Sequence, residues 1–208
     1  MSLFSDLVHH HIYRGVEVPL TARAYDYVLA GNGLFNRARS PYLAARVPVT
    51  FAHVAGLPDL EPALQLAIRP GLIPGRLLYT VLTDARRRAY AGREQMYRFQ
   101  FAGSLIRIIK PDQEAGAASV HYDATDQDGV ICDLHSHHTM RAFFSATDDC
   151  DENSFRFYAV VGQVLACPEI RLRLGMYGDF VSLPMTALFT GAGPFVDLYQ
   201  TEVNHDGG

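Results

Sequence analysis

The sequence is poor in cysteine and in charge, and it lacks any long apolar run. Its three cysteines, Cys132, Cys150 and Cys167, are an odd number without a Cys-x-x-Cys pair. We therefore expect free, mostly buried thiols in a reducing cytoplasm rather than a disulfide framework. Charged residues make up only 19% of the chain, which argues against a disordered protein. No apolar stretch is long enough to cross a membrane, and residues 1–11 lack the pattern of a secretory signal.

Positive charge is scarce relative to negative charge. The chain has 18 Lys and Arg against 22 Asp and Glu, a formal net charge of -4. Nucleic-acid binding requires clustered basic residues that neutralise phosphates, so no nucleic-acid partner is expected. The three arginines at 86–88 are interpreted as the solvated end of a helix. The three adjacent histidines at 9–11 are interpreted as solvated residues of an N-terminal tail rather than a metal site.

A turn rich in proline and glycine at 68–75 divides the chain. With 208 residues, of which 49% are apolar, the chain suits one domain with a small extension. We expect residues 1–70 to form a β-leaning N-terminal extension and residues 71–208 to form the main domain. The extension is predicted to contain strands at 25–30, 34–35 and 42–51, a hairpin turn at 31–33 and a short helix at 60–68.

The main domain begins with an amphipathic helix predicted over 75–90. Leu78, Val81, Leu82 and Ala85 recur there at helical spacing. Alternating apolar and polar residues then predict a hairpin with strands at 95–101 and 105–109. We expect further strands at 119–122, 129–134, 155–164, 169–176 and 180–183, with a helix in the region of residues 133–148. The fold class is therefore predicted as α+β, a mixed sheet flanked by helices.

Two histidines on one predicted strand suggest a metal site. His135 and His137 are two residues apart, so both imidazoles lie on the same face of the strand. Asp148 follows after a turn and adds a carboxylate. Two imidazoles and one carboxylate leave the fourth position of a tetrahedral zinc ion open, as in catalytic zinc sites. Such a site needs a proton shuttle, usually a Glu, and a donor for the oxyanion, which Ser145 can supply.

The pattern His-Ser-His, seven residues, Ser, two residues, Asp resembles the JAMM signature of the JAB/MPN metallopeptidase family. The likeness covers about residues 73–185, and the 135–149 segment is most similar to prokaryotic JAB proteins of the PRTRC system protein A type. It implies a JAB/MPN domain over 71–208, similar to cytidine deaminase in fold. It also implies Zn²⁺ held by His135, His137 and Asp148, with Ser145 as the oxyanion stabiliser.

The family also has a glutamate upstream that binds the zinc-bound water. Glu94 stands at that place after the first helix, and Glu114 is the alternative. The sequence departs from the family at Tyr97, where a glycine is common, and at His138, where a proline is common. The departure at Tyr97 leaves the identity of the general base open between the two glutamates.

The resemblance implies an amide-bond hydrolase, an isopeptidase or C-terminal processing peptidase acting on a ubiquitin-like protein or its conjugates. A ThiF-like activating enzyme is the further partner that it implies, in a bacterial cytoplasm and without a membrane. The alternatives are a non-catalytic scaffold of the MPN type and an enzyme whose cleft is covered by its N-terminal extension. Members of the first kind usually lose the metal ligands, which are all present here.

Overall fold

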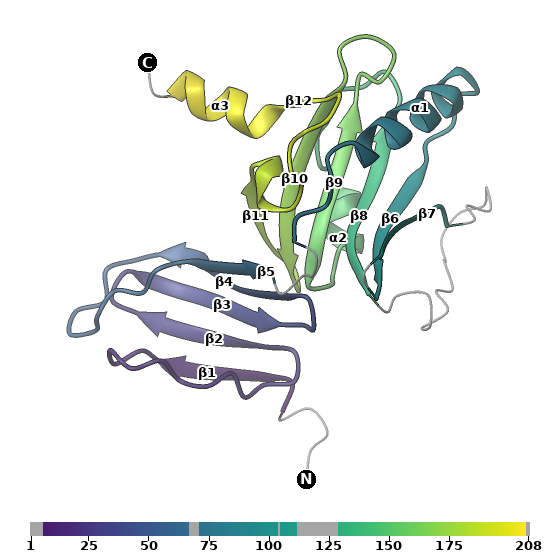
Figure 1. The fold of residues 1–208 in the computed structure, drawn as a ribbon. Helices are drawn as coiled ribbons and strands as arrows, with labels where there is room; N and C mark the ends of the chain where they lie inside the picture. The colour runs from purple at the N-terminus through teal and green to yellow at the C-terminus, as the bar shows by residue number, and fades with distance from the viewer. Residues whose placement is uncertain (1–5, 67–70, 104, 112–128, 207–208) are drawn as a thin grey trace.

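The computed structural model describes residues 6–66, 71–103, 105–111 and 129–206. These residues form two mixed β-sheets with few helices (Figure 1). This architecture agrees with the predicted α+β class, whereas the likeness to cytidine deaminase stays a prediction. In the described part of the chain, no helix is both long and apolar enough to span a membrane.

The first sheet is formed by the N-terminal part of the chain. Its strand order within the described residues is β1-β2-β3-β4-β5; β1 and β2 are parallel, and the other neighbours are antiparallel. The predicted hairpin turn at 31–33 joins β2 to β3. The strands are β1 (Val8–Ile12), β2 (Tyr25–Ala30), β3 (Gly33–Arg39), β4 (Leu43–Phe51) and β5 (Ala63–Leu66).

The second sheet has the described order β11-β10-β9-β8-β6-β7, and the short strand β12 pairs with β10. β8 lies between β6 and β9 and is parallel to β9. It is therefore a central strand of this sheet, which places its polar residues inside the molecule's sheet rather than at an edge. The strands are β6 (Met96–Ala102), β7 (Leu105–Ile109), β8 (Val130–His137), β9 (Arg156–Gly162), β10 (Glu169–Met176), β11 (Asp179–Leu183) and β12 (Val196–Asp197).

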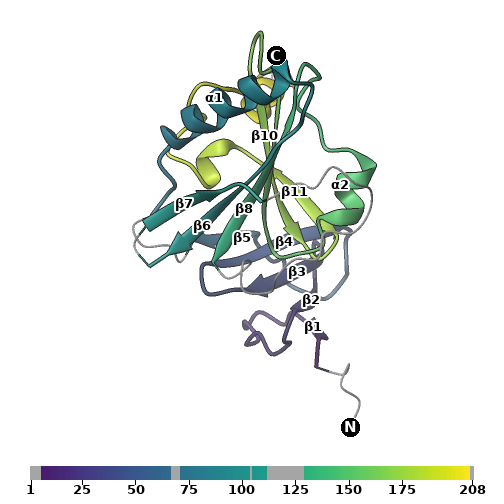
Figure 2. The ribbon, with the colours of Figure 1, turned by 90° about the vertical axis from the view of Figure 1, so that its right-hand side faces the viewer.

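Two helices lie on opposite faces of the second sheet (Figure 2). α1 (Leu77–Tyr90) buries the predicted apolar stripe and begins three residues after Pro74, which suits a helix start. Its Asp84 accepts a hydrogen bond of 3.1 Å from the Tyr97 hydroxyl of β6. α2 (Ala146–Asp151) lies on the other face. A 3-10 turn (Met185–Ala187) and α3 (Leu198–Asp206) complete the described helical elements.

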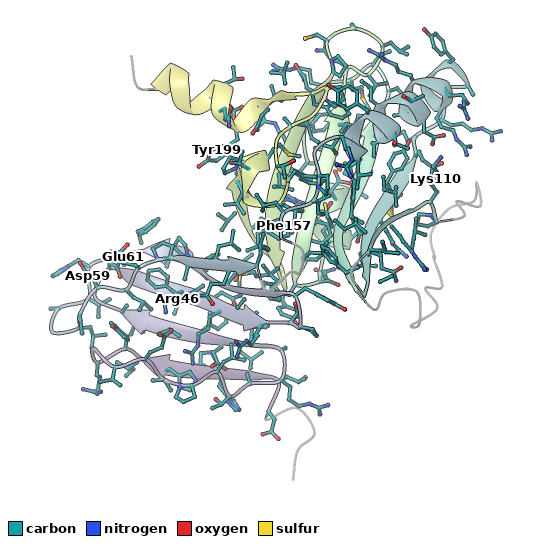
Figure 3. All side chains as sticks on the ribbon, in the orientation of Figure 1. Arg46, Asp59, Glu61, Lys110, Phe157 and Tyr199 are labelled. Atoms are coloured by element: carbon teal, nitrogen blue, oxygen red, sulfur yellow. The ribbon has the colours of Figure 1, made fainter. Side chains whose placement is uncertain are left out.

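The two sheets share one hydrophobic core. Leu43 and Val47 of the first sheet belong to the same buried cluster as Leu134 and Phe157 of the second. Phe157, which is labelled in Figure 3, is completely buried. The N-terminal extension is thus packed against the main domain, and the boundary near residue 70 stays a prediction because residues 67–70 are not described.

Further contacts join the first sheet to the turn between β10 and β11. The Tyr25 and Tyr177 rings stack with centroids 4.9 Å apart. The Asn36 side-chain amide donates to the Met176 carbonyl at 3.2 Å and to an Asp179 carboxylate oxygen at 2.9 Å. Asn36 is fully buried, and these bonds satisfy the NH2 part of its side-chain amide, whereas its Oδ1 has no hydrogen-bond partner among the described residues.

Three expectations from the sequence were wrong. The predicted helix at 60–68 is strand β5 over its described part, because Leu64 and Leu66 pack on the core while the backbone pairs with β4. A short apolar run does not distinguish the two structures. The histidines at 9–11 form part of strand β1 rather than a solvated tail. Cys150 and Cys167 are exposed; only Cys132 is buried. The predicted strand at 119–122 lies outside the described residues.

Candidate metal centre

β8 places the two motif histidines on the face of the sheet that α2 covers. Leu134 points into the core on the α1 side, so the alternation of the strand directs His135 and His137 to the opposite face. His137 is buried and His135 half-buried. The rings contact aromatic side chains of the following loop, with Phe143 4.8 Å from His137 and Phe144 6.4 Å from His135, centroid to centroid.

The loop after β8 returns towards the histidines because it lies directly on β9. Gly162 pairs with His137, and a Cβ atom at Gly162 would lie 2.2 Å from the backbone nitrogen of Ala142. The Gln163 amide donates to the Met140 carbonyl at 2.7 Å. Only glycine permits this close approach of two backbones, and the approach brings the next residues of the loop to the start of α2.

α2 presents Asp148 to the histidines. Ser145 is the N-cap of the helix, and Asp148 at the third helical position completes a capping box. Asp148 Oδ2 accepts hydrogen bonds from the Ser145 amide at 2.6 Å and the Ser145 hydroxyl at 2.7 Å. These bonds leave Asp148 Oδ1 directed at the histidine pair, 3.5 Å from His135 Nε2.

The three side chains form a compact group of metal-binding atoms. His135 Nε2 and His137 Nε2 are 3.1 Å apart, and one ligand atom from each of the three residues lies within 4.8 Å of the others. Two nitrogens at zinc-bond length in a tetrahedron are roughly 3.3 Å apart. The observed spacing therefore fits a single tetrahedral zinc ion.

The electrostatic setting favours the metal-binding forms of these groups. Burial lowers the pKa of His135 to about 4, and the charges of His137 and Arg173 lower it as well. The imidazole is therefore neutral near pH 7, as a ligand must be. Burial raises the pKa of Asp148, but the hydrogen bonds from Ser145 and the electrostatic attraction of His135 and His137 outweigh it, and the net pKa is lowered.

Arg173 of β10 fixes α2 to the sheet. Its guanidinium binds Glu152 through Nε at 2.8 Å and Nη2 at 2.6 Å, and Asp149 through Nη1 at 2.5 Å. The rings of Phe144 and Phe180 lie 3.9 Å and 3.8 Å from its central carbon. Two acidic residues that follow Asp148, Asp149 and Glu152, are thus paired with a buried arginine.

Sequence reasoning missed Arg173 because nothing local identifies it. Its partners are 21 to 24 positions away in the chain, and an arginine that alternates with leucines on a strand reads as a solvent-facing residue. Asp133 was missed in the same way. It lies on the same face of β8 as His135 and forms ion pairs with Arg98 at 3.3 Å and Arg156 at 3.1 Å.

Glu94 lies just before β6, exposed to solvent. The Ser136 amide donates to the Gln95 carbonyl at 3.1 Å, and the Gln95 amide donates to the Ser136 hydroxyl at 3.0 Å. Because β6 and β8 are antiparallel and Met96 pairs with His135, continuing this register places Glu94 beside His137. The structure thus brings the chain at Glu94 to the histidines, while Glu114 lies outside the described residues.

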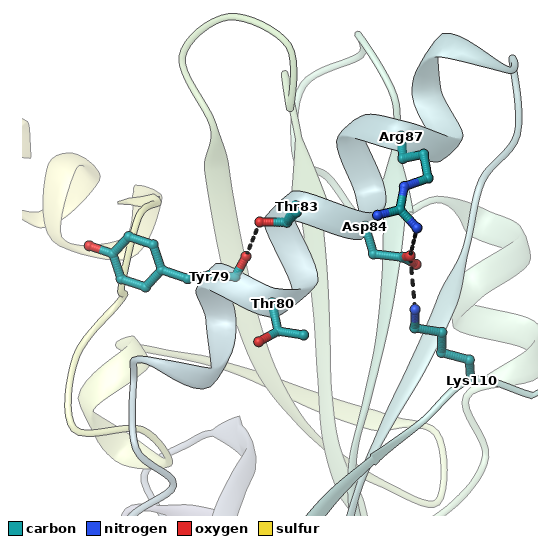
Figure 4. Close-up of a pocket in the computed structure, with 6 residues that line it drawn as sticks. All are labelled: Tyr79, Thr80, Thr83, Asp84, Arg87 and Lys110. Atoms are coloured by element: carbon teal, nitrogen blue, oxygen red, sulfur yellow. Dashed lines mark hydrogen bonds and ion pairs between the residues drawn. The ribbon is translucent and has the colours of Figure 1, made fainter.

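A cavity lies on α1, away from the metal-binding group. It has a volume of about 400 Å³ and is lined by Tyr79, Thr80, Thr83, Asp84, Arg87 and Lys110 (Figure 4). The Asp84 carboxylate is bound by Lys110 at 2.8 Å, by the Tyr97 hydroxyl and, more distantly, by Arg87 at 3.9 Å. Burial raises its pKa, but the bonds from Lys110 and Tyr97 lower the net value. The carboxylate is fully engaged, so this cavity offers no free acid or base.

Comparison with known proteins agrees with the motif. Residues 83–174 match the family model described as prokaryotic homologs of the JAB domain. The matched segment runs from within α1 to within β10 and so contains Glu94 and every residue of the His-x-His…Ser-x-x-Asp pattern. The match supports a place in the JAB/MPN family, and the mixed sheets with few helices are consistent with such a domain. No curated protein matches the chain.

Proposed function

We propose that this chain is a zinc-dependent hydrolase of amide bonds, a metallopeptidase of the JAMM kind. The observation that carries the proposal is the convergence of His135 Nε2, His137 Nε2 and Asp148 Oδ1 within one zinc-sized group. This group lies in the segment that matches the JAB model. Three protein ligands of this composition leave a position open for water, as catalytic zinc sites do.

The residues present suit zinc, since neutral imidazoles and a carboxylate are its usual ligands in hydrolases. When bound, zinc would supply a water molecule with a pKa of roughly 7 and a positive charge that polarises a carbonyl group. Glu94 is then the base that accepts the proton of the attacking water and passes it to the leaving amine. Ser145 holds Asp148 in place through its hydroxyl proton. The hydroxyl lies beside the ligand group and stabilises a developing oxyanion only when it turns this one proton from Asp148 to the substrate.

The substrate that we propose is an isopeptide or C-terminal peptide bond of a ubiquitin-like protein, with a ThiF-like activating enzyme as a further partner in the cytoplasm. This assignment rests on the resemblance to JAB proteins of the PRTRC system protein A type. An extended substrate tail can add to a strand edge, which provides affinity through the main chain. β7 forms such an edge among the described strands of the second sheet.

The alternative is a scaffold or an enzyme covered by its own N-terminal extension. On the second sheet, the contacts with the first sheet include Met176, Tyr177 and Asp179, and Phe101, whose ring stacks on Tyr42; none of these residues belongs to the metal-binding group. Removing the extension is a poor test of a covered cleft, because its leucines and valines complete the shared core. Metal content and turnover of the full chain separate the alternatives more cleanly.

The proposal is tested by loading the full chain with Zn²⁺ and measuring cleavage of ubiquitin-like fusions encoded beside its own gene. We expect cleavage that stops in His135→Ala and Asp148→Ala, with loss of the bound zinc from this site. His138→Ala is the matched control, since it removes a neighbouring imidazole and should leave both zinc and turnover intact. Full zinc occupancy of this site in both ligand variants would refute the assignment, and absence of cleavage by the zinc-loaded protein would favour the scaffold.

A further inference from the structure

A second group of metal-binding side chains lies in the first sheet. His9 and His11 are two residues apart on β1, so they share one face of the strand. Asp26 of β2 is the direct neighbour of His9 in the parallel register. One ligand atom from each of the three residues lies within 4.8 Å of the others. His10 points to the opposite face, where its ring packs on Tyr27 at 5.5 Å.

The contact between His11 and Asp26 is close but is not a hydrogen bond. His11 Nε2 lies 3.2 Å from Asp26 Oδ2, and this buried nitrogen has no hydrogen-bond partner among the described residues. A buried polar atom without a partner costs free energy. A cation bound by this nitrogen and the Asp26 carboxylate would give the nitrogen the partner that it lacks.

His9 is held by a contact typical of metal-binding histidines. Its Nδ1 lies 2.8 Å from the Thr21 hydroxyl oxygen. When Nδ1 carries the proton and donates it to Thr21, Nε2 is left with a free lone pair. A hydrogen bond on the second ring nitrogen fixes the tautomer and the orientation of a ligand imidazole. Thr21 thus gives His9 the support that a ligand needs.

The two groups of the molecule are built alike. Each has two histidines spaced by one residue on a strand and one aspartate from a neighbouring element. In each, a histidine nitrogen approaches the carboxylate at a similar distance, 3.5 Å between His135 and Asp148 and 3.2 Å between His11 and Asp26. Imidazole and carboxylate together suit zinc and neighbouring first-row ions.

We propose that His9, His11 and Asp26 form a second divalent-metal site that ties the edge strand β1 to β2. This site is independent of the group formed by His135, His137 and Asp148, which is called the JAB centre below. β1 pairs only with β2 among the described strands of this sheet. An ion that joins side chains of both strands adds a cross-link where backbone pairing is limited to one side. The second site is therefore structural, and catalysis does not depend on it.

Arg37 sets the strength of this site. Its Nη2 lies 2.8 Å from Asp26 Oδ2, and the backbone amides of Thr21 and Ala22 donate to the same carboxylate at 3.3 and 3.1 Å. These bonds hold the completely buried carboxylate rigid, but the guanidinium also shares its negative charge. The second site should therefore bind an ion more weakly than the JAB centre, and a chelator should remove the ion of the second site first.

The test counts metal ions in the full chain. After treatment with a chelator, the protein is reloaded with Zn²⁺, freed of excess ion and analysed for zinc per chain. We expect two ions in the unchanged protein, one in His9→Ala and one in His11→Ala. His10→Ala is the matched control, because it removes an imidazole of the same run from the opposite face; it should keep two ions. His135→Ala should keep one.

Several outcomes would overturn the second site. One ion in the unchanged protein that survives in His11→Ala but not in His135→Ala leaves only the JAB centre. An equal loss in His10→Ala and His9→Ala indicates loose binding by the histidine run. Circular dichroism without metal establishes that each variant is folded, and His11→Gln provides a less disruptive second variant. Turnover should persist in His9→Ala. The second metal site and the proposed hydrolase activity can therefore each fail while the other stands.

Discussion

The hydroxyl of Ser145 donates a hydrogen bond of 2.7 Å to Asp148 Oδ2, and the Ser145 amide donates to the same oxygen at 2.6 Å. The serine of the motif therefore positions the aspartate of the motif before any substrate is present. Its spacing of three residues is the spacing of a helix capping box. The serine thus has a structural reason to stand there in addition to its proposed part in catalysis.

Replacing this serine should affect folding, metal binding and turnover together. In Ser145→Ala, we expect the loss of the cap to destabilise the protein by about 1 kcal/mol. Asp148, then held only by the backbone amide of residue 145, should bind zinc roughly tenfold more weakly. Urea unfolding and competition with a chromogenic chelator measure the two effects. Ser145→Thr keeps the hydroxyl and should largely restore both; unchanged zinc affinity in the alanine variant would show that the capping box does not position the ligand.

Glu94→Gln should separate metal binding from catalysis. The amide keeps the size of the side chain but cannot accept the proton of the attacking water. We expect unchanged zinc content and a fall in turnover of roughly 10²–10⁴-fold. Glu114→Gln is the control, because Glu114 is the other candidate for this role. A fall in turnover only in Glu114→Gln would transfer the role of general base to that residue.

Removing Arg173 should loosen α2. In Arg173→Met, the buried Glu152 loses its counter-charge. Above about pH 7, where Glu152 is ionised, breaking this buried ion pair should cost about 3–5 kcal/mol. We also expect roughly tenfold weaker zinc binding, since Asp149 and Glu152 then no longer fix the helix that carries Asp148. The spectrum of bound Co²⁺ reports the altered ligand geometry independently of stability.

A control for this variant is available in the same region. Arg141→Met removes an exposed arginine that lies 3.5 Å from Glu169, and surface ion pairs contribute little. It should leave stability and the Co²⁺ spectrum nearly unchanged. If Arg173→Met keeps the spectrum of the unchanged protein, Arg173 supports the fold but does not position the metal ligand.

Stability should depend on pH through Glu152. Burial raises its pKa to about 7 from 4.5, although the Arg173 charge acts in the opposite direction. The folded state therefore binds this proton more tightly than the unfolded chain. Its contribution to stability is complete below about pH 4.5 and is lost as pH rises to about 7.

A comparison of the unchanged protein with Glu152→Gln, both without metal, isolates this effect. The glutamine does not titrate, so the difference in free energy of unfolding between the two proteins should change by roughly 1–3 kcal/mol over this pH range. Urea unfolding at a series of pH values measures it. A constant difference would mean that Glu152 is ionised throughout, paired with Arg173.

Local patterns in the sequence were enough to predict the elements that carry the motif. The helical spacing of Leu78, Val81 and Leu82 predicted α1, and alternation predicted the hairpin of β6 and β7. The two-residue spacing of His135 and His137 correctly implied that both lie on one face of β8, since this follows from strand geometry alone.

Features that depend on distant contacts could not be predicted in this way. β1 consists largely of histidines, and it is a strand because β2 pairs with it rather than because its residues favour a strand. β5 was predicted as part of a helix at 60–68, because a short apolar run does not distinguish a helix from a strand. The role of Arg173 exists only once β10 and α2 have come together.

Gly162 is required by the motif although it is not one of the four residues by which the motif is recognised. The return of the chain to α2 requires a position on β9 that has no side chain, because the backbone of Ala142 fills that space. A search pattern restricted to the histidines, serine and aspartate would accept chains in which a bulky residue at this position pushes the loop outward and separates the aspartate from the histidines. A search pattern that also requires a glycine on the strand parallel to the histidine strand would select chains in which the aspartate can reach the histidines.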